Sequence, residues 1–337
     1  MTEEASLTNF STVRMIKDVS PSISSVSPSP FASGLFLPPR IGRKGEGGLR
    51  TRGLFKRGGY FDSDVPGDDT PLFSIVTVVF NGEAHLEQSL LSVLNQAYPN
   101  VEYIVVDGGS TDGTLDIIRK YDEAIDYWVS EPDQGIGDGF NKGISLSTGK
   151  IIGIINADDW YENNAFEQVV WAYRQNPESI IHGDLQFWTN SKPAYVFHGR
   201  DDLAHLRPTI NHPTVFVPRT VYDVVGPFLP EFRKAMDFEW LGRAKMAGIP
   251  FVHLDSVLAN MRRGGVSDKK WLESYIEAAK ARQLHGVSTI YNLYLFLKSA
   301  FLTLGRKTLE ILKLESLIQI YRKYWSIGKK RNIKHTL

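Results

Sequence analysis

Two adjacent carboxylates, Asp158 and Asp159, directly follow the apolar run "KIIGIINA" (150–157). Like charges this close repel each other, and burying them costs free energy unless a cation compensates. Hard divalent cations such as Mg²⁺ and Mn²⁺ favour carboxylate oxygens as ligands. The pair therefore predicts a divalent-cation site with Asp158 and Asp159 as its ligands. Capping of a helix that begins near Trp160 is the alternative, since Asp is a favoured N-cap residue.

The segments around this pair alternate between the periodicities of strands and of helices. Strand-like apolar runs lie at 73–80, 101–107, 125–131 and 150–155, and amphipathic helical patterns lie between them at 85–96, 110–121 and 139–147. This alternation predicts an α/β fold with βαβ units around a mostly parallel central sheet. Ligands of such sheets bind beyond the carboxyl ends of the strands, where Asp107, Asp158 and Asp159 fall.

The overall charge and the absence of cysteine exclude several classes of function. Lys plus Arg and Asp plus Glu are both 38, so no global field attracts nucleic acid, and we expect no nucleic-acid partner. Without cysteine, disulfides, thiolate metal sites and cysteine nucleophiles are excluded. The first residues, "MTEEASLTNF", lack the apolar core of a secretory signal, so we expect a cytoplasmic enzyme body.

Composition divides the chain into four parts. Residues 1–70 are rich in Ser, Pro and Gly and are expected to form a flexible or loosely attached extension. The α/β body that follows is divided into the ranges 71–160 and 161–286. The range 287–337 reads as an amphipathic basic helical tail, with ten Lys/Arg against two Glu after residue 297. Such a tail suits the inner face of the plasma membrane, and packing on the domain or in a homodimer is the alternative.

Several motifs together carry a resemblance to a known family over roughly residues 72–266. They are "SIVTVVFNGEAHLEQSLLSVLNQAYPNVEYIVVDGGSTDGT", "SEPDQGIGDGFNKGI" and "NADDWY". In this order they resemble the inverting family 2 glycosyltransferases of bacterial surface polysaccharide biosynthesis, which have the GT-A nucleotide-sugar fold. The resemblance implies transfer of a sugar from a nucleotide diphosphate sugar, expected to be UDP-linked, with Mg²⁺ or Mn²⁺. The implied acceptor is a saccharide or a lipid-linked saccharide. The resemblance also implies that residues 71–160 form a nucleotide-sugar-binding half and that residues 161–286 form an acceptor-binding half.

The same resemblance implies roles for residues on the donor side. Asp107 would accept hydrogen bonds from the base or ribose, and Asp138 would face the donor. Asn156 stands where many relatives have the first Asp of a DxD motif, and it would bind ribose or a metal-bound water. Arg262 and Arg263 lie in a loop that would close over the diphosphate, because guanidinium groups form forked hydrogen bonds with phosphate. A solvated arginine pair is the alternative.

On the acceptor side, the resemblance implies that Asp237 of "AMDFEW" is the catalytic base, with Glu239 as the runner-up. An inverting transfer needs a base because the acceptor hydroxyl loses its proton as it attacks. Capping of a helix is the competing role for Asp237. His212 is a candidate contact of the acceptor, with a purely structural role as the alternative.

Other classes of protein remain as alternatives. A sugar-phosphate nucleotidyltransferase would also use an α/β sheet, Asp residues and Mg²⁺, but it should carry a Gly-rich basic loop, which "VFNGEAHLEQS" lacks. A non-catalytic relative would bind the sugar nucleotide without turnover. A dinucleotide-binding oxidoreductase is disfavoured because Phe140 stands where the G-x-G-x-x-G fingerprint needs a small residue.

Overall fold

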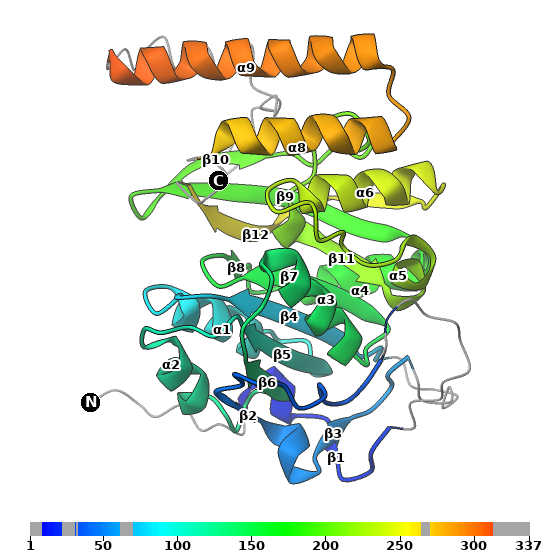
Figure 1. The fold of residues 1–337 in the computed structure, drawn as a ribbon. Helices are drawn as coiled ribbons and strands as arrows, with labels where there is room; N and C mark the ends of the chain where they lie inside the picture. The colour runs from blue at the N-terminus through cyan, green and yellow to red at the C-terminus, as the bar shows by residue number, and fades with distance from the viewer. Residues whose placement is uncertain (1–8, 22–30, 32, 61–69, 264–269, 313–337) are drawn as a thin grey trace, which may run out of the picture.

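The computed structural model describes residues 9–21, 31, 33–60, 70–263 and 270–312 (Figure 1). The strands of these residues are β1 (Ile16–Lys17), β2 (Gly45–Gly47), β3 (Phe55–Lys56), β4 (Phe73–Val79), β5 (Val101–Asp107), β6 (Tyr127–Ser130), β7 (Ile151–Asn156), β8 (Trp160–Tyr161), β9 (Ile180–Thr189), β10 (Lys192–Phe197), β11 (Val215–Pro218) and β12 (Phe251–Arg262). The helices are α1 (Leu86–Leu94), α2 (Thr114–Lys120), α3 (Ile136–Leu146), α4 (Ala165–Gln175), α5 (Arg219–Val225), α6 (Met236–Met246), α8 (Trp271–Leu284) and α9 (Thr289–Ile311), with 3-10 turns at Ser11–Val13, Leu49–Arg52 and His212–Thr214.

One sheet runs through the centre of the molecule in the order β2-β6-β5-β4-β7-β11-β9-β12-β8, with β10 paired to β9. The four strands β6, β5, β4 and β7 are parallel to one another, which confirms the predicted mostly parallel centre. Antiparallel β11 then joins β7 to β9. The sheet is therefore continuous across the two predicted halves of the chain.

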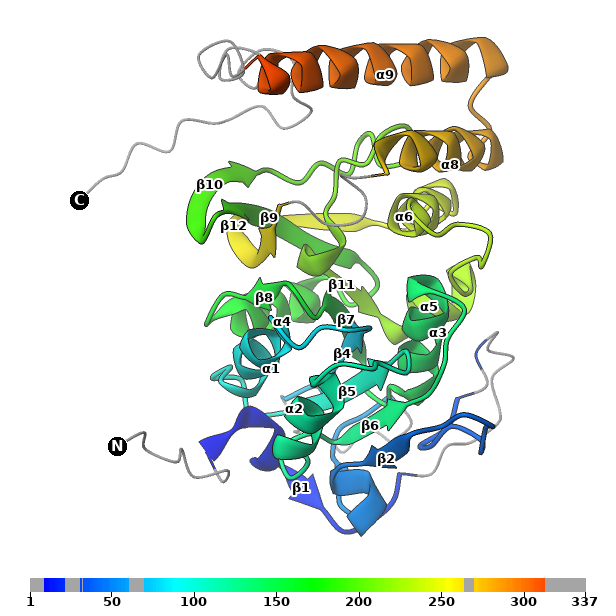
Figure 2. The same cartoon turned by 60° about the vertical axis from the view of Figure 1, so that its left-hand side comes forward.

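Helices cover both faces of this sheet because the central strands are apolar on both sides. Along β4, Phe73 and Ile75 belong to one core cluster, and Val76 and Val78 belong to the other. This alternation follows from the two-residue period of side chains along a strand. Helices α1, α2 and α4 pack on the first face, and α3, α5 and α6 pack on the second (Figure 2). The carboxyl ends of β4, β5 and β7 stay free to hold a ligand.

Part of the N-terminal segment packs closely on the sheet, which differs from the loose attachment that its composition predicts. Strand β2 pairs antiparallel with β6 and extends the sheet (Figure 2). The Arg50 guanidinium lies 2.5 Å from Glu102 on β5, and both side chains are 2% exposed. Burial alone would raise the pKa of Glu102, but the Arg50 charge and hydrogen bonds from Ser74 and Thr148 hold it below its ordinary value. Buried ion pairing and strand pairing fasten this segment together with apolar contacts, since Phe10 and Phe31 belong to the two core clusters.

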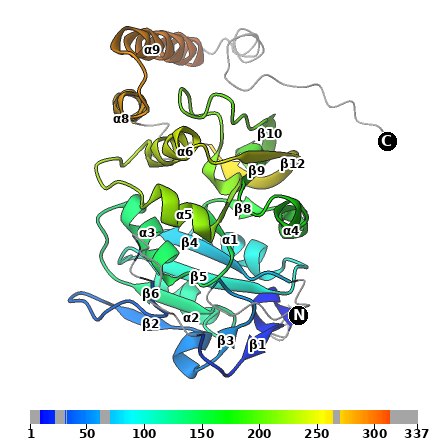
Figure 3. The same ribbon diagram turned by 90° about the vertical axis from the view of Figure 1, so that its right-hand side faces the viewer.

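The two C-terminal helices of the described chain stack on α6, with α6 beneath α8 and α8 beneath α9 (Figure 3). Asn292 of α9 accepts a hydrogen bond from Arg282 of α8 (2.7 Å), and Thr303 is bonded to Tyr275 (2.6 Å). The described part of the predicted tail is therefore a helix packed on the domain, and residues 313–337 lie outside the described ranges. Among the described residues, we find no helix with the length and apolar character needed to cross a membrane.

Candidate functional site

The predicted metal ligands lie at the carboxyl end of β7. Asp158 is partly buried and Asp159 is 1% exposed. The Asp159 backbone N–H donates to the Asn156 carbonyl (3.1 Å), and the Asn156 side-chain amide donates to the Asp159 carboxylate (3.4 Å). The residues that follow form strand β8 rather than a helix, and α4 begins at Ala165. A helix N-cap near Trp160 is thus excluded as the reason for this acidic pair.

The burial of Asp159 beside Asp158 has an electrostatic cost. Its Oδ1 atom is buried and has no hydrogen-bond partner among the described residues. Burial raises the pKa of the Asp159 carboxyl well above its ordinary range, and the neighbouring Asp158 charge raises it further. An unpartnered, buried carboxylate oxygen beside a second carboxylate fits the oxygen ligands that Mg²⁺ and Mn²⁺ prefer. The residues present therefore fit a divalent cation.

Arg262 lies directly beside this pair because β12 carries it there. Strand β12 pairs antiparallel with β8, so Asn260 lies opposite Trp160. The Arg262 guanidinium lies over the Trp160 ring, 4.5 Å from its centroid, and donates to the Asp158 carbonyl and to Gln88. A cationic side chain thus reaches the edge of the acidic pair, within reach of a phosphate bound there.

Arg263 directly follows the end of β12, and its backbone N–H donates to the Trp188 carbonyl at 2.9 Å. This bond continues the ladder between β9 and β12 by one residue. The sequence predicts a loop at Arg262 and Arg263, but β12 extends to Arg262, and residues 264–269 lie outside the described residues. Closure of this segment over the diphosphate stays a prediction.

Asp107 lies at the matching end of β5. Its register partner Val79 lies on β4, whose neighbouring residue Val78 pairs with Asn156 on β7. At about 4.8 Å between adjacent strands, Asp107 and Asn156 are about 10 Å apart. The Asp107 carboxylate is 0% exposed and accepts hydrogen bonds from Ser110 and Ser130. These bonds fix the loop after β5, and direct contact of Asp107 with a nucleotide stays a prediction.

Asp138 lies in the first turn of α3. Its carboxylate accepts the backbone N–H of Gln134 (3.1 Å) and lies 3.6 Å from the Lys142 ammonium. Lys142 also pairs with Glu131 at 2.9 Å. Asp138 therefore stabilises the turn that leads into α3, and the structure does not bring it into contact with the acidic pair.

The candidate base Asp237 lies in the first turn of α6. Its Oδ1 atom accepts the neighbouring Phe238 N–H (2.8 Å), and burial raises the pKa of the carboxyl. Glu277 of α8 accepts the N–H groups of residues 233, 234 and 235, which precede the helix, at 2.9, 2.6 and 3.0 Å. The Phe238 N–H belongs to the first turn of α6, so its bond to Asp237 keeps a capping role for Asp237 beside the predicted role as a base.

The runner-up Glu239 lies in a different environment. Its side chain is 0% exposed, and both of its oxygens accept hydrogen bonds from Arg243, at 2.5 and 2.9 Å. A carboxylate held in this way is a poor proton acceptor because its lone pairs are occupied by a permanent cation. The geometry therefore favours Asp237 over Glu239.

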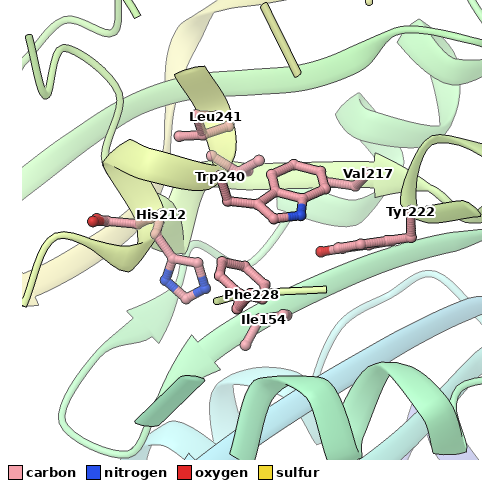
Figure 4. Close-up of a pocket in the computed structure, with 9 residues that line it drawn as sticks. Ile154, His212, Val217, Tyr222, Phe228, Trp240 and Leu241 are labelled. Carbon is pink, nitrogen blue, oxygen red and sulfur yellow. The ribbon is translucent and has the colours of Figure 1, made fainter. Parts of the chain in front are cut away.

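Asp237 and His212 line one small cavity between β7, β11, α5 and α6. Figure 4 shows His212 and Tyr222 at opposite ends of it, with Trp240 and Phe228 between them. The His212 ring stacks on Phe140 with centroids 4.7 Å apart. Burial lowers the pKa of His212 to about 4, so the ring is neutral at neutral pH. The other walls of the cavity are apolar.

Three side chains in this region escaped the sequence reasoning. Trp160 stands inside the quoted "NADDWY" motif, and its position next to an acidic pair was the available signal. Gln88 lies on α1 and Glu277 on α8, far in sequence from Arg262 and Asp237. Only the fold brings Gln88 to Arg262 and Glu277 to the backbone just before α6, so no local pattern could have found these contacts.

Comparisons with known proteins agree with this geometry. Residues 74–243 match the protein family described as "Glycosyl transferase family 2". The putative teichuronic acid biosynthesis glycosyltransferase TuaG of Bacillus subtilis is 34% identical over 213 residues, covering 60% of this chain and 83% of that protein. The PGL/p-HBAD biosynthesis glycosyltransferase of Mycobacterium bovis is 29% identical over 177 residues, covering 50% and 68%. An uncharacterized glycosyltransferase of Haemophilus influenzae is 34% identical over 120 residues, and the chain spans 48% of its length.

Solved structures share the fold. Staphylococcus aureus TarS 1–349 has a TM-score of 0.52 at 18% identity, covering 68% of this chain and 72% of that one. The mannosyltransferase PcManGT of Pyrobaculum calidifontis, solved with GDP-Man and Mn²⁺, has a TM-score of 0.50 at 18% identity, covering 78% and 85%. Together with the family match, these structures identify the chain as a glycosyltransferase that belongs to family 2 and has the GT-A fold.

Proposed function

We propose that this protein is a metal-dependent, inverting glycosyltransferase that transfers a sugar from a nucleotide diphosphate sugar to a saccharide or lipid-linked acceptor. The observation that carries the proposal is the buried, unpartnered oxygen of Asp159 beside Asp158, at the carboxyl end of β7. Such an arrangement costs stability, and a divalent cation bound with the donor offsets that cost. Asp158 and Asp159 also lie within residues 74–243, which match family 2, and this position supports the proposal.

On the donor side, Asp158 and Asp159 would hold Mg²⁺ or Mn²⁺, which neutralises negative charge on the departing diphosphate. Asn156 borders this site and would orient the ribose or a water molecule. The Arg262 guanidinium, which rests on Trp160, would turn toward the diphosphate, and Arg263 would follow in the closing loop. Asp107 and Asp138 shape the loops on which the nucleotide lies.

On the acceptor side, Asp237 would take the proton of the attacking hydroxyl. Its position in an apolar cavity raises its pKa, which makes it a stronger base than an exposed aspartate. His212 lines the same cavity and stays neutral, so it would contact the acceptor by packing or hydrogen bonding rather than by charge. Attack from the face opposite the diphosphate inverts the anomeric centre.

A UDP-linked sugar is the donor we favour. Support comes from TarS, which has been solved with UDP and with UDP-GlcNAc, whereas PcManGT has been solved with GDP-Man. The relatives named for teichuronic acid and PGL/p-HBAD biosynthesis support a role in making surface glycans or glycolipids. Such pathways supply the saccharide or lipid-linked acceptor proposed here.

A panel of nucleotide sugars tests the proposal directly. Purified protein is incubated with UDP- and GDP-sugars, with Mn²⁺, with Mg²⁺ or with chelator, and the released nucleotide and thermal stabilisation are both measured. We expect stabilisation by one donor class, and slow hydrolysis of it, only when the cation is present. Stabilisation without release of nucleotide, even with saccharide acceptors added, would indicate a non-catalytic relative. Equal hydrolysis in chelator would contradict metal dependence.

We also propose that α9 rests on the cytoplasmic surface of an anionic membrane. Its outer side presents an apolar stripe at helical spacing, and the exposed members are Ile290 (85%), Leu293 (56%), Leu297 (56%), Phe301 (76%) and Leu304 (54%). The stripe leads into the basic segment, with ten Lys/Arg against two Glu after residue 297. Apolar area together with basic charge is the combination that binds anionic lipid.

The double variant Leu297→Ser, Phe301→Ser tests this surface. We expect the parent protein to sediment with anionic liposomes and the variant to stay in solution, because each lost side chain removes apolar area from the contact. Trp171→Ser is the matched control, since Trp171 is 65% exposed on α4. Equal sedimentation of all three proteins would contradict the proposal. Dissociation of a dimer by the double variant, without liposome binding by the parent, would assign the stripe to a homodimer.

A further inference from the structure

A second polar cluster lies on the sheet away from the acidic pair of β7. It is built on Asp184 of β9, and it takes residues from β12 and from the segment after β10. Strand β9 continues from Asp184 to Trp188, whose ring contacts Trp160 near the donor site. At about 3.3 Å per residue, Asp184 and Trp188 are about 13 Å apart along the strand. The cluster is therefore a separate location, which the proposed reaction does not use.

Asp184 is the centre of this cluster. Its carboxylate is 4% exposed and accepts hydrogen bonds from His198 Nδ1 (2.6 Å), His253 Nε2 (2.8 Å) and the Gly199 N–H (3.2 Å). Asp255 stands two residues beyond His253 on β12. One ligand atom from each of Asp184, His198 and Asp255 lies within 4.8 Å of the other two. Imidazoles and carboxylates thus converge on one point from three separate segments.

His182 adds an independent observation. It lies two residues before Asp184, on the same face of β9, and it is 0% exposed. Its Nε2 atom lies 3.8 Å from the Asp201 carboxylate, whereas its Nδ1 atom has no hydrogen-bond partner among the described residues. Its ring lies 5.0 Å from that of His253. A buried ring nitrogen without a partner costs free energy. Such a cost is unusual for a cluster that serves packing alone.

We propose that Asp184, His198 and Asp255 bind a divalent transition-metal cation of the Zn²⁺ class, with His253 holding Asp184 in place. Imidazole nitrogen with carboxylate oxygen suits Zn²⁺ better than Mg²⁺, which prefers oxygen alone. Tetrahedral Zn²⁺ with bonds of about 2.1 Å has ligands about 3.4 Å apart, and the three candidate ligand atoms already lie within 4.8 Å of one another. Asp255 is exposed, so the ion has a path from solvent and a fourth position for water.

Such an ion would join three segments that are distant in sequence. His198 begins the connection that runs from β10 to the turn at His212–Thr214, while Asp184 and Asp255 belong to β9 and β12. The cation would therefore fasten this connection to the sheet. It would stabilise the acceptor side of the fold without touching the donor.

Zn²⁺ binding to the full, untagged chain tests the proposal. After treatment with chelator, the protein is dialysed against Zn²⁺ in excess Mg²⁺, and bound zinc and the melting temperature are measured. We expect one bound Zn²⁺ per chain and a rise in melting temperature. Asp255→Asn and His198→Gln should each weaken binding by ~10-fold or more and remove the thermal shift. Asp116→Asn and His85→Gln, which change exposed residues of the same types elsewhere, should leave both unchanged.

Two variants distinguish a folding defect from the loss of a metal ligand. Asp255 is exposed, so Asp255→Asn should retain the circular dichroism of the parent. Asp158→Asn, which alters the proposed donor site, should still bind Zn²⁺. Equal zinc binding by the cluster variants and their controls would overturn the proposal. So would loss of zinc in Asp158→Asn alone, or the absence of stoichiometric zinc in the parent.

Discussion

Asp159→Asn should lower sugar transfer at least about 100-fold, because a ligand of the cation is lost. The fold should stay intact. The stability of the metal-free protein should stay the same or rise. Asp159 is buried beside Asp158, its pKa is raised well above the ordinary range, and at neutral pH its ionised form therefore costs folding free energy. An amide of the same shape removes that charge. Donor turnover and the melting temperature of the metal-free protein are the two measurements.

Nucleotide affinity with and without Mn²⁺ distinguishes a metal ligand from a merely structural residue. In the parent, Mn²⁺ should strengthen nucleotide binding, whereas in Asp158→Asn and Asp159→Asn the two affinities should coincide. Asp116→Asn is the control, since its side chain is 83% exposed on α2. If Mn²⁺ strengthened nucleotide binding equally in parent and variants, Asp158 and Asp159 would not be the ligands.

Asp237→Asn should lower turnover by roughly 100-fold or more with donor affinity preserved. The amide keeps the size of the side chain and its hydrogen bond from Phe238, but it cannot take a proton. Because that hydrogen bond is kept, we expect no more than a small loss of stability. Steady-state transfer with a saturating donor measures the effect on turnover, and nucleotide titration measures affinity.

The pH profile gives a second readout for Asp237. Burial raises its pKa, and a base works only when deprotonated, so transfer should fall on the acid side at a pH above the ordinary Asp range. Asp237→Asn should abolish this limb of the profile. Glu239→Gln is the comparison, because it breaks the buried pair with Arg243 and should reduce stability more than turnover. Near-normal transfer by folded Asp237→Asn would assign proton removal to another acid.

The sequence predicts most of the central sheet because its signals are local. Apolar runs at 73–80, 101–107 and 150–155 became β4, β5 and β7, and their parallel order follows from the helices between them. The helix expected at 110–121 begins later, at Thr114. Asp107 and Asp112 bond to Ser110 and Thr114, and these bonds hold the preceding residues in a loop.

The environment of each candidate site residue could not be predicted in the same way. Asp158 and Asp159 are recognisable as an acidic pair, yet only the structure shows that one is buried with an unpartnered oxygen. Nothing local to Glu239 shows that Arg243 occupies both of its oxygens. The contact of Glu277 on α8 with the backbone just before α6 joins helices distant in sequence. Burial and long-range partners are properties of the fold, and they decide which of several acids is free to react.

The buried pair between Arg50 and Glu102 indicates that the folded domain begins before the range that matches the family. The range that matches family 2 begins at residue 74, after Arg50 and strand β2. A polypeptide cut there would keep Glu102 in the interior with its counter-charge gone, and it would leave the β6 edge of the sheet open to other chains. The range that matches the family is therefore shorter than the part of the chain that packs together. Residues before 74 supply the buried counter-charge of Glu102 and the strand that covers the β6 edge, so we expect a chain without them to aggregate.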